Sequence, residues 1–445
     1  MKLKSYPEYK DSGVEWIDEI PKNWNCSKIK HIADVKISNV DKKSKPSEPD
    51  VLLCNYTDVY NNEFIIDNLD FMKATASIEQ IKKLSLKKGD VIITKDSEAA
   101  DDIAVPALVK KNLNNVVCGY HLALIIPAVD IQGDYLFRLL ESKQINDQFV
   151  IAANGVTRFG ISTYPIKNSY LTVPSIKEQE KISSFLDKKT LEIDLTIEKD
   201  TRLIELLKEK RTALINHVVT KGLDPTVKMK DSGVEWIGEI PEDWELRKIS
   251  QSFDIIGSGT TPKSQEERYY DAGDVPWVIT GDLNDDILND TSKKITKEAF
   301  RDYSTLKMYQ KNSLIIAMYG ATIGKISLLN FEACVNQACC VLANSKILKS
   351  RFVFYWFLGN KNSIISLSYG GGQPNISQDV IKTLKIQVPP KEKQSEIVRH
   401  LEQETSKLDL TIQKIQEHIK LLEEYKKSLI HHVVTGKMDV REVAV

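Results

Sequence analysis

The sequence predicts an α+β protein in which two globular domains are separated by two long helices, with the second half of the chain repeating the first. Three observations predict this class. A long amphipathic stretch occurs twice, a short head segment occurs twice, and each head is followed by a segment that contains short β-like runs. Repeats of this quality indicate two copies of one structural unit, and therefore a pseudo-two-fold internal repeat.

The long stretches run from Ser175 to Thr220 and from Pro390 to Thr435, and they align without a gap. Their apolar residues recur mainly at spacings of three, four and seven, which is typical of a helix with one buried face. At about 1.5 Å per residue each helix would be about 65 Å long. A helix of that length usually packs against another like it, and the second copy is the obvious partner.

Asp200 falls on the apolar stripe where the second copy has Ile415, so we expect a local imperfection in the helix packing there. The predicted stripe comprises Ile182, Leu186, Ile193, Ile197, Ile204, Leu207, Leu214 and Val218 in the first helix, and Ile397, Leu401, Leu408, Ile412, Ile415, Ile419, Leu422, Leu429 and Val433 in the second.

The head segments read KDSGVEWIDEIPKNW from Lys10 and KDSGVEWIGEIPEDW from Lys230. Together with the long helices they divide the chain into repeated and variable parts. The predicted organisation is a head at 1–25, a variable domain at 26–173, a long helix at 174–221, a linker and second head at 222–245, a second variable domain at 246–388, a second long helix at 389–436 and a tail at 437–445.

Each variable segment contains short β-like runs separated by Gly, Asn, Asp and Pro, together with helix-like pieces, and therefore predicts a compact α+β domain with long loops. The strand candidates are 51–53, 90–94, 122–126, 275–279 and 313–317, and the helix candidates are 135–141 and 352–358. The variable segments diverge strongly from each other, whereas the heads and long helices barely change. This contrast indicates that the heads and long helices form a shared structural frame, and that the two variable domains it carries recognise different targets.

Composition excludes several classes. A chain of 445 residues is too long for one core, and its net charge of −1 gives no global basic signature for nucleic-acid binding. The six cysteines form no CxxC pair and indicate reduced thiols in a cytoplasmic protein. The first residues contain no apolar run, and no stretch approaches the ~20 apolar residues of a membrane helix, so we expect neither a signal peptide nor a membrane partner.

Two glycine-rich stretches imitate a phosphate-binding loop. Residues 320–325 read GATIGK, one residue too short for that motif, and residues 257–264 read GSGTTPKS, with Pro262 where the second glycine must be. We interpret both as turns between strands. His217, His431 and His432 lie near helix C-termini, where an imidazole favours the helix dipole, and we expect a structural role for them. Acid pairs such as Asp101-Asp102 and Asp285-Asp286 are interpreted as solvated turns.

At this point the chain resembles the specificity (S) subunits, HsdS, of type I restriction-modification systems. The resemblance covers nearly the whole chain, and the repeat order is more specific than any single motif. The residues that carry it are the paired heads, Gly259–Pro262, Val275-Pro276-Trp277, Gly320–Lys325 and Gln373–Ser377. The first variable domain departs from the common pattern, because residues 93–109 read ITKDSEAADDIAVPALV where the second domain has IIAMYGATIGKISLL.

The resemblance implies a non-catalytic subunit whose two variable domains are target recognition domains, each reading one half of a bipartite, asymmetric DNA target. It implies double-stranded DNA, two modification (adenine methyltransferase) subunits and, through the modification complex, restriction subunits as partners. S-adenosylmethionine, ATP and Mg would be bound by those partners, and no catalytic residue, cofactor or metal is expected in this chain. The helices would set the spacing and dock the modification subunits.

The candidate DNA-binding residues combine polar side chains with glycine-rich or glycine-flanked loops. Arg and Lys suit guanine, Asn and Gln suit adenine, and Ser and Thr contact bases and phosphates alike. The three glycines at 370–372, beside Gln373 and Asn375, would let a backbone approach a duplex closely. The candidates are Lys95, Ser97, Tyr120, His121, Thr157 and Arg158 in the first domain, and Thr260, Thr261, Lys263, Tyr319, Thr322, Lys325, Gln337, Gln373 and Asn375 in the second.

Duplex DNA has local two-fold symmetry, so we expect two homologous readers to be related by a two-fold axis. Such an axis perpendicular to the helices makes them an antiparallel coiled coil, with the variable domains at opposite ends. Trp16, Trp24, Trp236 and Trp244 are candidates for the modification-subunit contact or for packing at the helix ends. Two other classes stay open: a nucleotide- or S-adenosylmethionine-binding enzyme using the GATIGK loop, and a structural coiled-coil protein with two protein-binding domains.

Overall fold

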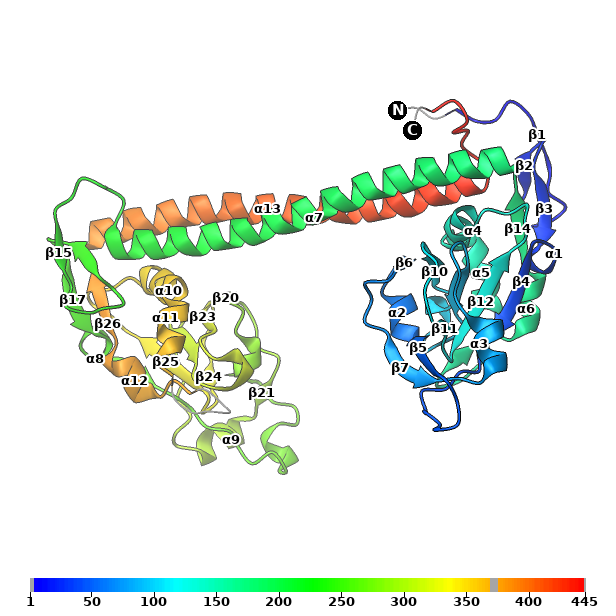
Figure 1. Cartoon of the computed structure of the whole chain (residues 1–445). Helices are drawn as coiled ribbons and strands as arrows, with labels where there is room; N and C mark the ends of the chain where they lie inside the picture. Colours follow the sequence, from blue (N-terminus) through cyan, green and yellow to red (C-terminus); the bar gives the residue numbers. More distant parts are fainter. Residues whose placement is uncertain (1–3, 369–374, 444–445) are drawn as a thin grey trace. The chain divides into compact units, whose positions relative to one another are not determined.

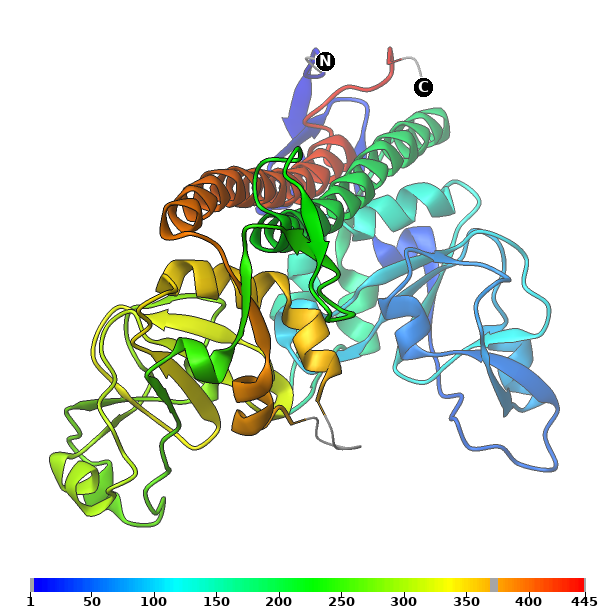
Figure 2. The ribbon, with the colours of Figure 1, turned by 90° about the vertical axis from the view of Figure 1, so that its left-hand side faces the viewer.

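The computed structural model describes residues 4–368 and 375–443, and the chain divides into two compact units. The first unit comprises Met1–Thr201 and Gln416–Val445, and the second comprises Arg202–Ile415. Each unit therefore contains one variable domain together with one part of each long helix (Figures 1 and 2). The units are described separately below.

The first variable domain contains two sheets. In the five-stranded sheet, ordered β4-β12-β8-β10-β6, neighbours are antiparallel except for the parallel pair β10–β6. The three-stranded sheet has the order β11-β5-β7. The strands are β4 (Ala33–Ile37), β5 (Asp50–Cys54), β6 (Phe64–Ile65), β7 (Met72–Thr75), β8 (Val91–Thr94), β10 (Pro106–Val109), β11 (Val116–Cys118) and β12 (Leu122–Pro127). The helices are α1 (Ile29–Ile32), α2 (Tyr56–Tyr60), α3 (Ile78–Leu84), α4 (Gly133–Leu140), α5 (Lys143–Ala152) and α6 (Thr163–Asn168).

The second variable domain repeats this plan, with a five-stranded sheet ordered β18-β25-β22-β23-β20 and a three-stranded sheet ordered β21-β19-β24. Its strands are β18 (Ile255–Gly257), β19 (Val275–Val278), β20 (Asp286–Leu288), β21 (Lys294–Ile295), β22 (Leu314–Ala317), β23 (Ile326–Leu329), β24 (Cys334–Val335) and β25 (Cys339–Ala343). Its helices are α8 (Ile249–Ser252), α9 (Lys297–Asp302), α10 (Ser350–Gly359), α11 (Lys361–Ser366) and α12 (Gln378–Thr383).

The two variable domains have the same topology although their sequences diverge. The parallel pair β10–β6 corresponds to β23–β20, and the parallel pair β11–β5 corresponds to β24–β19, while the other neighbours are antiparallel in both domains. Every strand and helix candidate named from the sequence lies within or beside an observed element of the same type. The predicted α+β class is therefore confirmed.

The first and last strands of each variable domain pair with each other. β3 (Asn25–Lys28) is antiparallel to β14 (Tyr170–Val173), and β17 (Glu245–Lys248) is antiparallel to β26 (Lys385–Val388). The two ends of each variable segment therefore lie side by side, which makes the segment a closed module on a repeated frame.

Each head is a short hairpin. β1 (Tyr9–Asp11) pairs with β2 (Glu19–Pro21), and β15 (Met229–Asp231) pairs with β16 (Glu239–Pro241). The tryptophan after each hairpin is buried, since Trp24 is 0% and Trp244 3% exposed. Both belong to the core of their unit, so of the two roles predicted for these tryptophans the packing role is confirmed. Trp16 and Trp236 are only partly buried.

The long helices α7 (Ile176–Lys221) and α13 (Lys391–Val434) have almost the bounds that the periodicity predicts. In the first unit Asp194 bonds Lys426 of α13 at 2.9 Å, and Asp200 bonds His418 at 2.7 Å. In the second unit Arg211 bonds Asp409 at 2.9 Å. Residue numbers fall along α13 as they rise along α7, so the predicted antiparallel pairing is confirmed in each unit. The predicted placement of the variable domains at opposite ends stays a prediction.

The buried face of each helix widens where a variable domain covers it. Towards the C-terminus of α7, Ile215, Val218 and Val219 are all buried, whereas the predicted Leu214 is only partly buried. Ile197, Leu207, Leu408, Ile419 and Leu422 are also only partly buried. Where these residues are only partly buried, the buried face of the helix is narrower than at the C-terminal end of α7. The imperfection expected at Asp200 is an interhelical hydrogen bond to His418.

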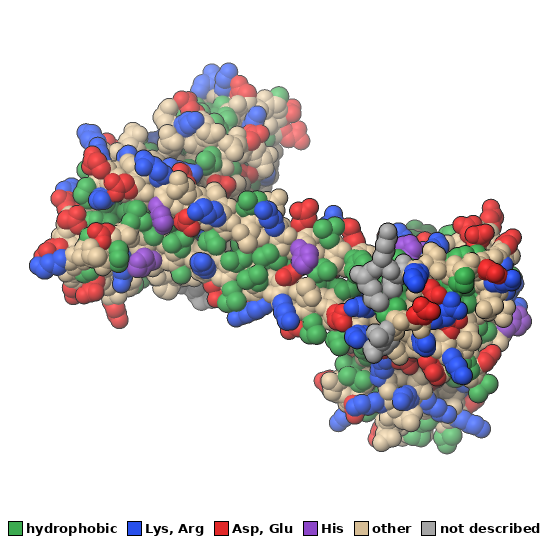
Figure 3. Space-filling view, turned by 90° about the horizontal axis from the view of Figure 1, so that it is seen from above, with side chains coloured by type: hydrophobic (Ala, Val, Ile, Leu, Met, Phe, Trp, Pro, Cys, Tyr) green, Lys and Arg blue, Asp and Glu red, His purple; other side chains and the backbone are tan. Residues whose placement is uncertain are grey.

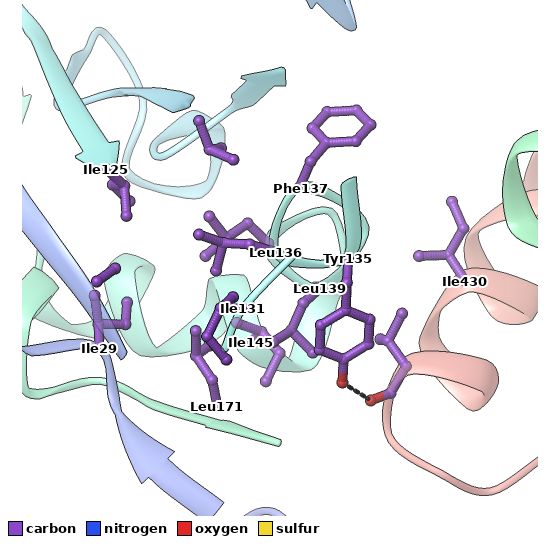
Figure 4. Packing of buried hydrophobic residues seen from close by; sticks show 14 of the residues in the cluster. Ile29, Ile125, Ile131, Tyr135, Leu136, Phe137, Leu139, Ile145, Leu171 and Ile430 are labelled. Carbon is purple, nitrogen blue, oxygen red and sulfur yellow. Dashed lines mark hydrogen bonds between the residues drawn. The ribbon is translucent and has the colours of Figure 1, made fainter. Parts of the chain in front are cut away.

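The core of the first unit joins the variable domain to both helices. Leu136 of α4 points to the side on which Ile125 of β12 lies, whereas Tyr135 of α4 points towards the end of α13, the helix that carries Ile430 (Figure 4). The Tyr135 hydroxyl donates to the carbonyl oxygen of Thr172 at 3.0 Å. Burial of each such side chain contributes about 1.5–3 kcal/mol, so domain and helices form one core rather than two bodies in light contact.

The predicted thiol state agrees with the structure, in which all six cysteines are free and five are buried. Burial raises the pKa of the Cys334, Cys339 and Cys340 thiols to about 12, so they are unreactive at neutral pH. Among residues 4–368 and 375–443, no helix is long and apolar enough to cross a membrane, and no group of His, Cys, Asp and Glu could hold a metal ion.

Candidate nucleic-acid interface

In the first domain the candidate residues lie on three segments that backbone hydrogen bonds hold together. Lys95 follows β8, and its N–H donates to the His121 carbonyl oxygen at 2.9 Å, just before β12. The N–H of Ile161 donates to the Lys95 carbonyl oxygen at 2.8 Å. A short pair of strands, β9 (Asp96–Ser97) and β13 (Phe159–Gly160), places the loop that contains Thr157 and Arg158 beside this point.

Asp96 organises these side chains. Its carboxylate accepts a hydrogen bond from Lys95 Nζ at 2.7 Å and bonds His121 Nδ1. Burial raises the pKa of Asp96, but the hydrogen bonds from Lys95 and His121 outweigh it, and the net pKa is lowered. Lys95 Nζ also lies 5.5 Å from the centre of the Tyr120 ring. The charge of Lys95 is therefore partly neutralised inside the protein, and Asp96 is a site residue that the sequence reasoning missed.

The remaining candidates of this domain differ in exposure. Tyr120 is 47% exposed, and Thr157 and Arg158 are exposed on their loop. Ser97 is 4% exposed, and its Oγ accepts a hydrogen bond from the Ala99 N–H at 3.4 Å. Tyr120, Thr157 and Arg158 are thus the side chains available to a ligand, whereas Ser97 supports the turn.

The turn after β8 carries Glu98, Asp101 and Asp102. The Tyr60 hydroxyl donates to Asp102 Oδ2 at 2.8 Å, and the Tyr60 ring stacks on Tyr56 with 5.5 Å between centres. Asp102 is therefore bonded to a tyrosine and is not the simple solvated turn acid that the sequence predicts. The i, i+4 spacing of the two tyrosines was the signal available for the aromatic pair.

In the second domain four candidates meet between the loop after β18 and the turn before β25. Thr261 Oγ1 donates to Gln337 Oε1, and Trp277 Nε1 donates to the Thr260 carbonyl oxygen at 3.2 Å. The backbone N–H of Lys263 donates to the Tyr303 hydroxyl at 3.1 Å. The residue itself is exposed. Gln337 is exposed and the two threonines are partly buried.

The other candidates of this domain lie beside them, after β22. The Met318 N–H donates to the Ala338 carbonyl oxygen at 2.9 Å. The backbones of Tyr319 and Asn375 form an isolated antiparallel β-bridge. Thr322 and Lys325 close the turn between the antiparallel strands β22 and β23, which confirms that GATIGK is a turn between strands. A phosphate loop instead leads from a strand into a helix. Gln373 and the glycines at 370–372 lie outside the described residues.

The two candidate sites occupy the same place in the shared topology. The bond from Lys95 N–H to the His121 carbonyl oxygen corresponds to that from Met318 N–H to the Ala338 carbonyl oxygen, because β8–β12 corresponds to β22–β25. The bond from Ile161 N–H to the Lys95 carbonyl oxygen likewise corresponds to that from Ile376 N–H to the Met318 carbonyl oxygen. The position after Lys95 or Met318 is therefore Asp96 in the first domain and Tyr319 in the second. On the paired segment, the position before His121 or Ala338 is Tyr120 in the first domain and Gln337 in the second.

A network of charged side chains joins the first domain to its helices. Burial raises the pKa of Glu141 to about 7, although Arg138 beside it favours the ionised form. Burial, helped by the nearby Glu63 carboxylate, makes this carboxyl keep its proton at a higher pH than usual. The carboxylates are Glu63, Asp134, Glu141, Asp187 and Asp194, and the cations are Lys110, Arg138 and Lys426.

We expect Glu141→Gln to flatten the pH dependence of stability between pH 5 and pH 8. Because the folded pKa of about 7 lies above the ordinary value of 4.5, the folded state binds this proton more tightly than the unfolded chain. The stabilisation that this one group contributes is therefore fully present below pH 4.5 and is lost as the pH rises through 7. Urea unfolding of the wild type and the variant at several pH values tests this, with Glu332→Gln, an exposed site in the other unit, as control. Equal pH slopes would contradict it.

His431 is structural, as predicted, but not through a positive charge on the helix dipole. Its Nδ1 bonds Ser142 Oγ at 3.1 Å, where the end of α13 meets α5. Burial and then the neighbouring Lys437 and His432 lower its pKa to about 4. The imidazole is therefore neutral at physiological pH and acts as a hydrogen-bonding group.

The family model of the type I restriction modification DNA specificity domain matches this chain twice, over residues 21–207 and 241–421. The matches cover most of the chain, and each spans a variable domain and the larger part of the long helix that follows it. The chain therefore belongs to the type I restriction modification DNA specificity family. Its function is DNA target recognition in a type I restriction-modification system.

Individual proteins agree with this assignment. The type I restriction enzyme MjaIX specificity subunit of Methanocaldococcus jannaschii is 23% identical over 461 aligned residues, which cover 100% of this chain and 99% of that protein. Two solved structures share the fold at 15% sequence identity. A chain of a type I R-M system, covered to 99%, has a TM-score of 0.75, and the HsdS subunit from Thermoanaerobacter tengcongensis, covered to 98%, has a TM-score of 0.58; each alignment covers 94% of the present chain.

Proposed function

We propose that each variable domain reads one half of a bipartite, asymmetric DNA target, and that the helix pair holds the two readings at a fixed spacing. The observation that carries this proposal is the equivalence of the two candidate sites. One topology presents Asp96 and Tyr120 in the first unit but Tyr319 and Gln337 at the same positions in the second. Different side chains on the same backbone positions suit different bases.

The helix pair is proposed to dock modification subunits at two equivalent places. Leu195 of α7 and Leu421 of α13 are 45% and 56% exposed in the first unit. The repeat-equivalent residues in the second unit, Leu410 and Leu206, are 53% and 45% exposed. From the antiparallel register, the two leucines of each unit lie within about one helical turn of each other along the axis. Figure 3 shows hydrophobic side chains among charged ones on the surface of the helices.

Repeated exposed leucines support a protein contact, because a solvated helix face would carry polar residues at these places. Restriction subunits would then join through the modification complex. Catalysis, and the binding of S-adenosylmethionine, ATP and Mg, would belong to those partners. The turn geometry of residues 320–325 supports this division, because it lacks the strand-to-helix arrangement of a phosphate loop. A cytoplasmic location agrees with six free thiols.

The test of the proposal is the affinity for specific DNA at several salt concentrations, with and without the modification subunit. A net charge of −1 gives this chain no overall attraction for phosphates, and Asp96 partly neutralises Lys95 at the first candidate site. We expect binding to tighten by roughly 100-fold or more when the partner is present.

Arg158→Ala, which removes an exposed cation, should reduce the salt slope by about one. The matched control Arg202→Ala removes an exposed cation of α7 that already pairs with Glu205, and it should leave the slope unchanged. Nanomolar binding by the chain alone at physiological salt would show that the charge argument is wrong.

A further inference from the structure

The first variable domain is joined to both long helices by ion pairs, in which Arg138 is buried and its charged partners are partly exposed. Arg138 of α4 is 1% exposed, and its Nε and Nη2 donate to Asp187 Oδ1 of α7 at 3.0 and 2.9 Å. Nη2 also donates to Thr190 Oγ1 at 3.1 Å, and Nη1 donates to Glu141 Oε2 at 2.7 Å. A planar guanidinium with this many partners fixes direction as well as distance.

At the second long helix the roles are reversed: the helix supplies the cation and the domain supplies the carboxylate. Lys426 of α13 lies with Nζ 2.8 Å from Glu63 Oε1, just before β6, and 2.9 Å from both carboxylate oxygens of Asp194 of α7. Lys110, after β10, adds a bond to Asp187 at 3.2 Å. The domain therefore meets the helix pair at Arg138, Lys110 and Glu63, which come from three separate elements. Three attachment points define an orientation.

The second unit keeps the helix part of this arrangement. At the repeat-equivalent positions Arg211 replaces Lys426, Asp409 replaces Asp194, and Arg211 Nε donates to Asp409 Oδ1 at 2.9 Å. The interhelical bond is thus common to both units and is not what distinguishes the first domain.

The domain part of the arrangement differs. The bond from Gln132 N–H to Gln179 Oε1 corresponds to that from Lys349 N–H to Gln394 Oε1, and this alignment puts Tyr355 in the place of Arg138. The strand registers β10–β6 and β23–β20 put Asp286 in the place of Glu63.

Among the described residues, no hydrogen bond or ion pair joins Arg211 to Asp286. A cavity of about 410 Å³ lies there instead, lined among others by Arg211, Asp286, Arg351 and Tyr355. Glu402 of α13 is the repeat equivalent of Asp187. It is bonded by Arg351 of the second domain at 2.9 Å. The second domain is therefore held at fewer charged points than the first.

We infer that Arg138, Lys426 and Glu63 are positioning residues that fix the orientation of the first variable domain on the helix pair. Because this orientation is fixed, the half-site that the first domain reads must lie at one distance from the other half-site. This inference rests on the proposed reading of a bipartite target. A tilt of the first domain would separate a buried guanidinium from its carboxylates, which is costly. A tilt of the second domain would break fewer such contacts.

The test uses the full chain assembled with its modification subunit. Affinity is measured for DNA targets that keep both half-sites but have the gap shortened or lengthened by one base pair. The variants are Arg138→Met, Arg138→Lys and Lys426→Met. The matched control is Arg211→Met. Arg211 is the repeat equivalent of Lys426, but within the described residues it bonds Asp409 of the other long helix and no carboxylate at the Glu63-equivalent position of its domain.

We expect Arg138→Met and Lys426→Met to lower the preference for the native gap by about tenfold, with the bases of each half-site unchanged. Arg138→Lys should restore part of the preference, and Arg211→Met should keep all of it. A general loss of stability would weaken binding to all gap lengths equally and would not change the ratio.

Lys426→Met leaves Arg138 paired with Asp187 and decides the matter if Arg138→Met does not fold. The inference is overturned if the wild type is strict about the gap and Lys426→Met is equally strict. If instead the wild type recognises no bipartite target, the proposed function itself has failed, and the two failures are thereby distinguished.

Discussion

Exchange of residues 26–173 for the corresponding segment of another family member is expected to change the bases of one half-site and leave the other half-site unchanged. Every candidate DNA-binding residue of the first unit lies within this segment. The segment is also a closed module, because β3 at its start pairs with β14 at its end. The exchange therefore replaces the candidate site, its sheets and its short helices but keeps the long helices α7 and α13.

The measurement is methylome sequencing of cells that express the exchanged chain with its modification subunit. A matched variant carries a second copy of this chain's own residues 246–388 in place of 26–173, and its two half-sites should become the same. If both halves change together in the first exchange, the two domains do not read independently and the modular account fails.

Leu195→Glu combined with Leu421→Glu is expected to reduce the number of bound modification subunits from two to one. These side chains are about half exposed, and their repeat equivalents Leu410 and Leu206 leave an unaltered second surface. Placing two carboxylates in an apolar contact removes the burial that drives association and adds a desolvation cost.

Native mass spectrometry of the saturated complex measures this stoichiometry. Val129→Glu is the control, because Val129 is fully exposed and lies in the loop between β12 and α4 rather than on a long helix. Substitution of all four leucines should abolish the complex. Retention of two modification subunits by the double variant would show that docking occurs elsewhere.

The features that sequence reasoning predicted well are those with a period or a repeat. The spacing of Ile182, Leu186 and Ile193 predicts a long helix without reference to any contact. The repeated heads predict equivalent hairpins for the same reason, and the two-fold argument predicts the antiparallel pairing. Divergent loops carry no such period, so the shared topology of the two domains emerges only from strand pairing.

Side-chain partners in the candidate site were less predictable. Lys95 and His121 both stand out as polar residues in a loop, but nothing in their spacing shows that Asp96 bonds both. The same holds for Glu63 and Lys426, which are 363 positions apart in the sequence and are bonded only in the folded chain. Ion pairs between distant segments depend on the tertiary fold and leave no local pattern.

The most direct test of the central claim is the methylome of a host that carries this chain with its modification subunit as the only such system. The account predicts modified adenines in one split motif, with two different short half-sites separated by a gap of constant length. Modification at a single uninterrupted motif, or at two half-sites with a freely varying gap, would contradict the reading of DNA by two domains on a rigid helix pair.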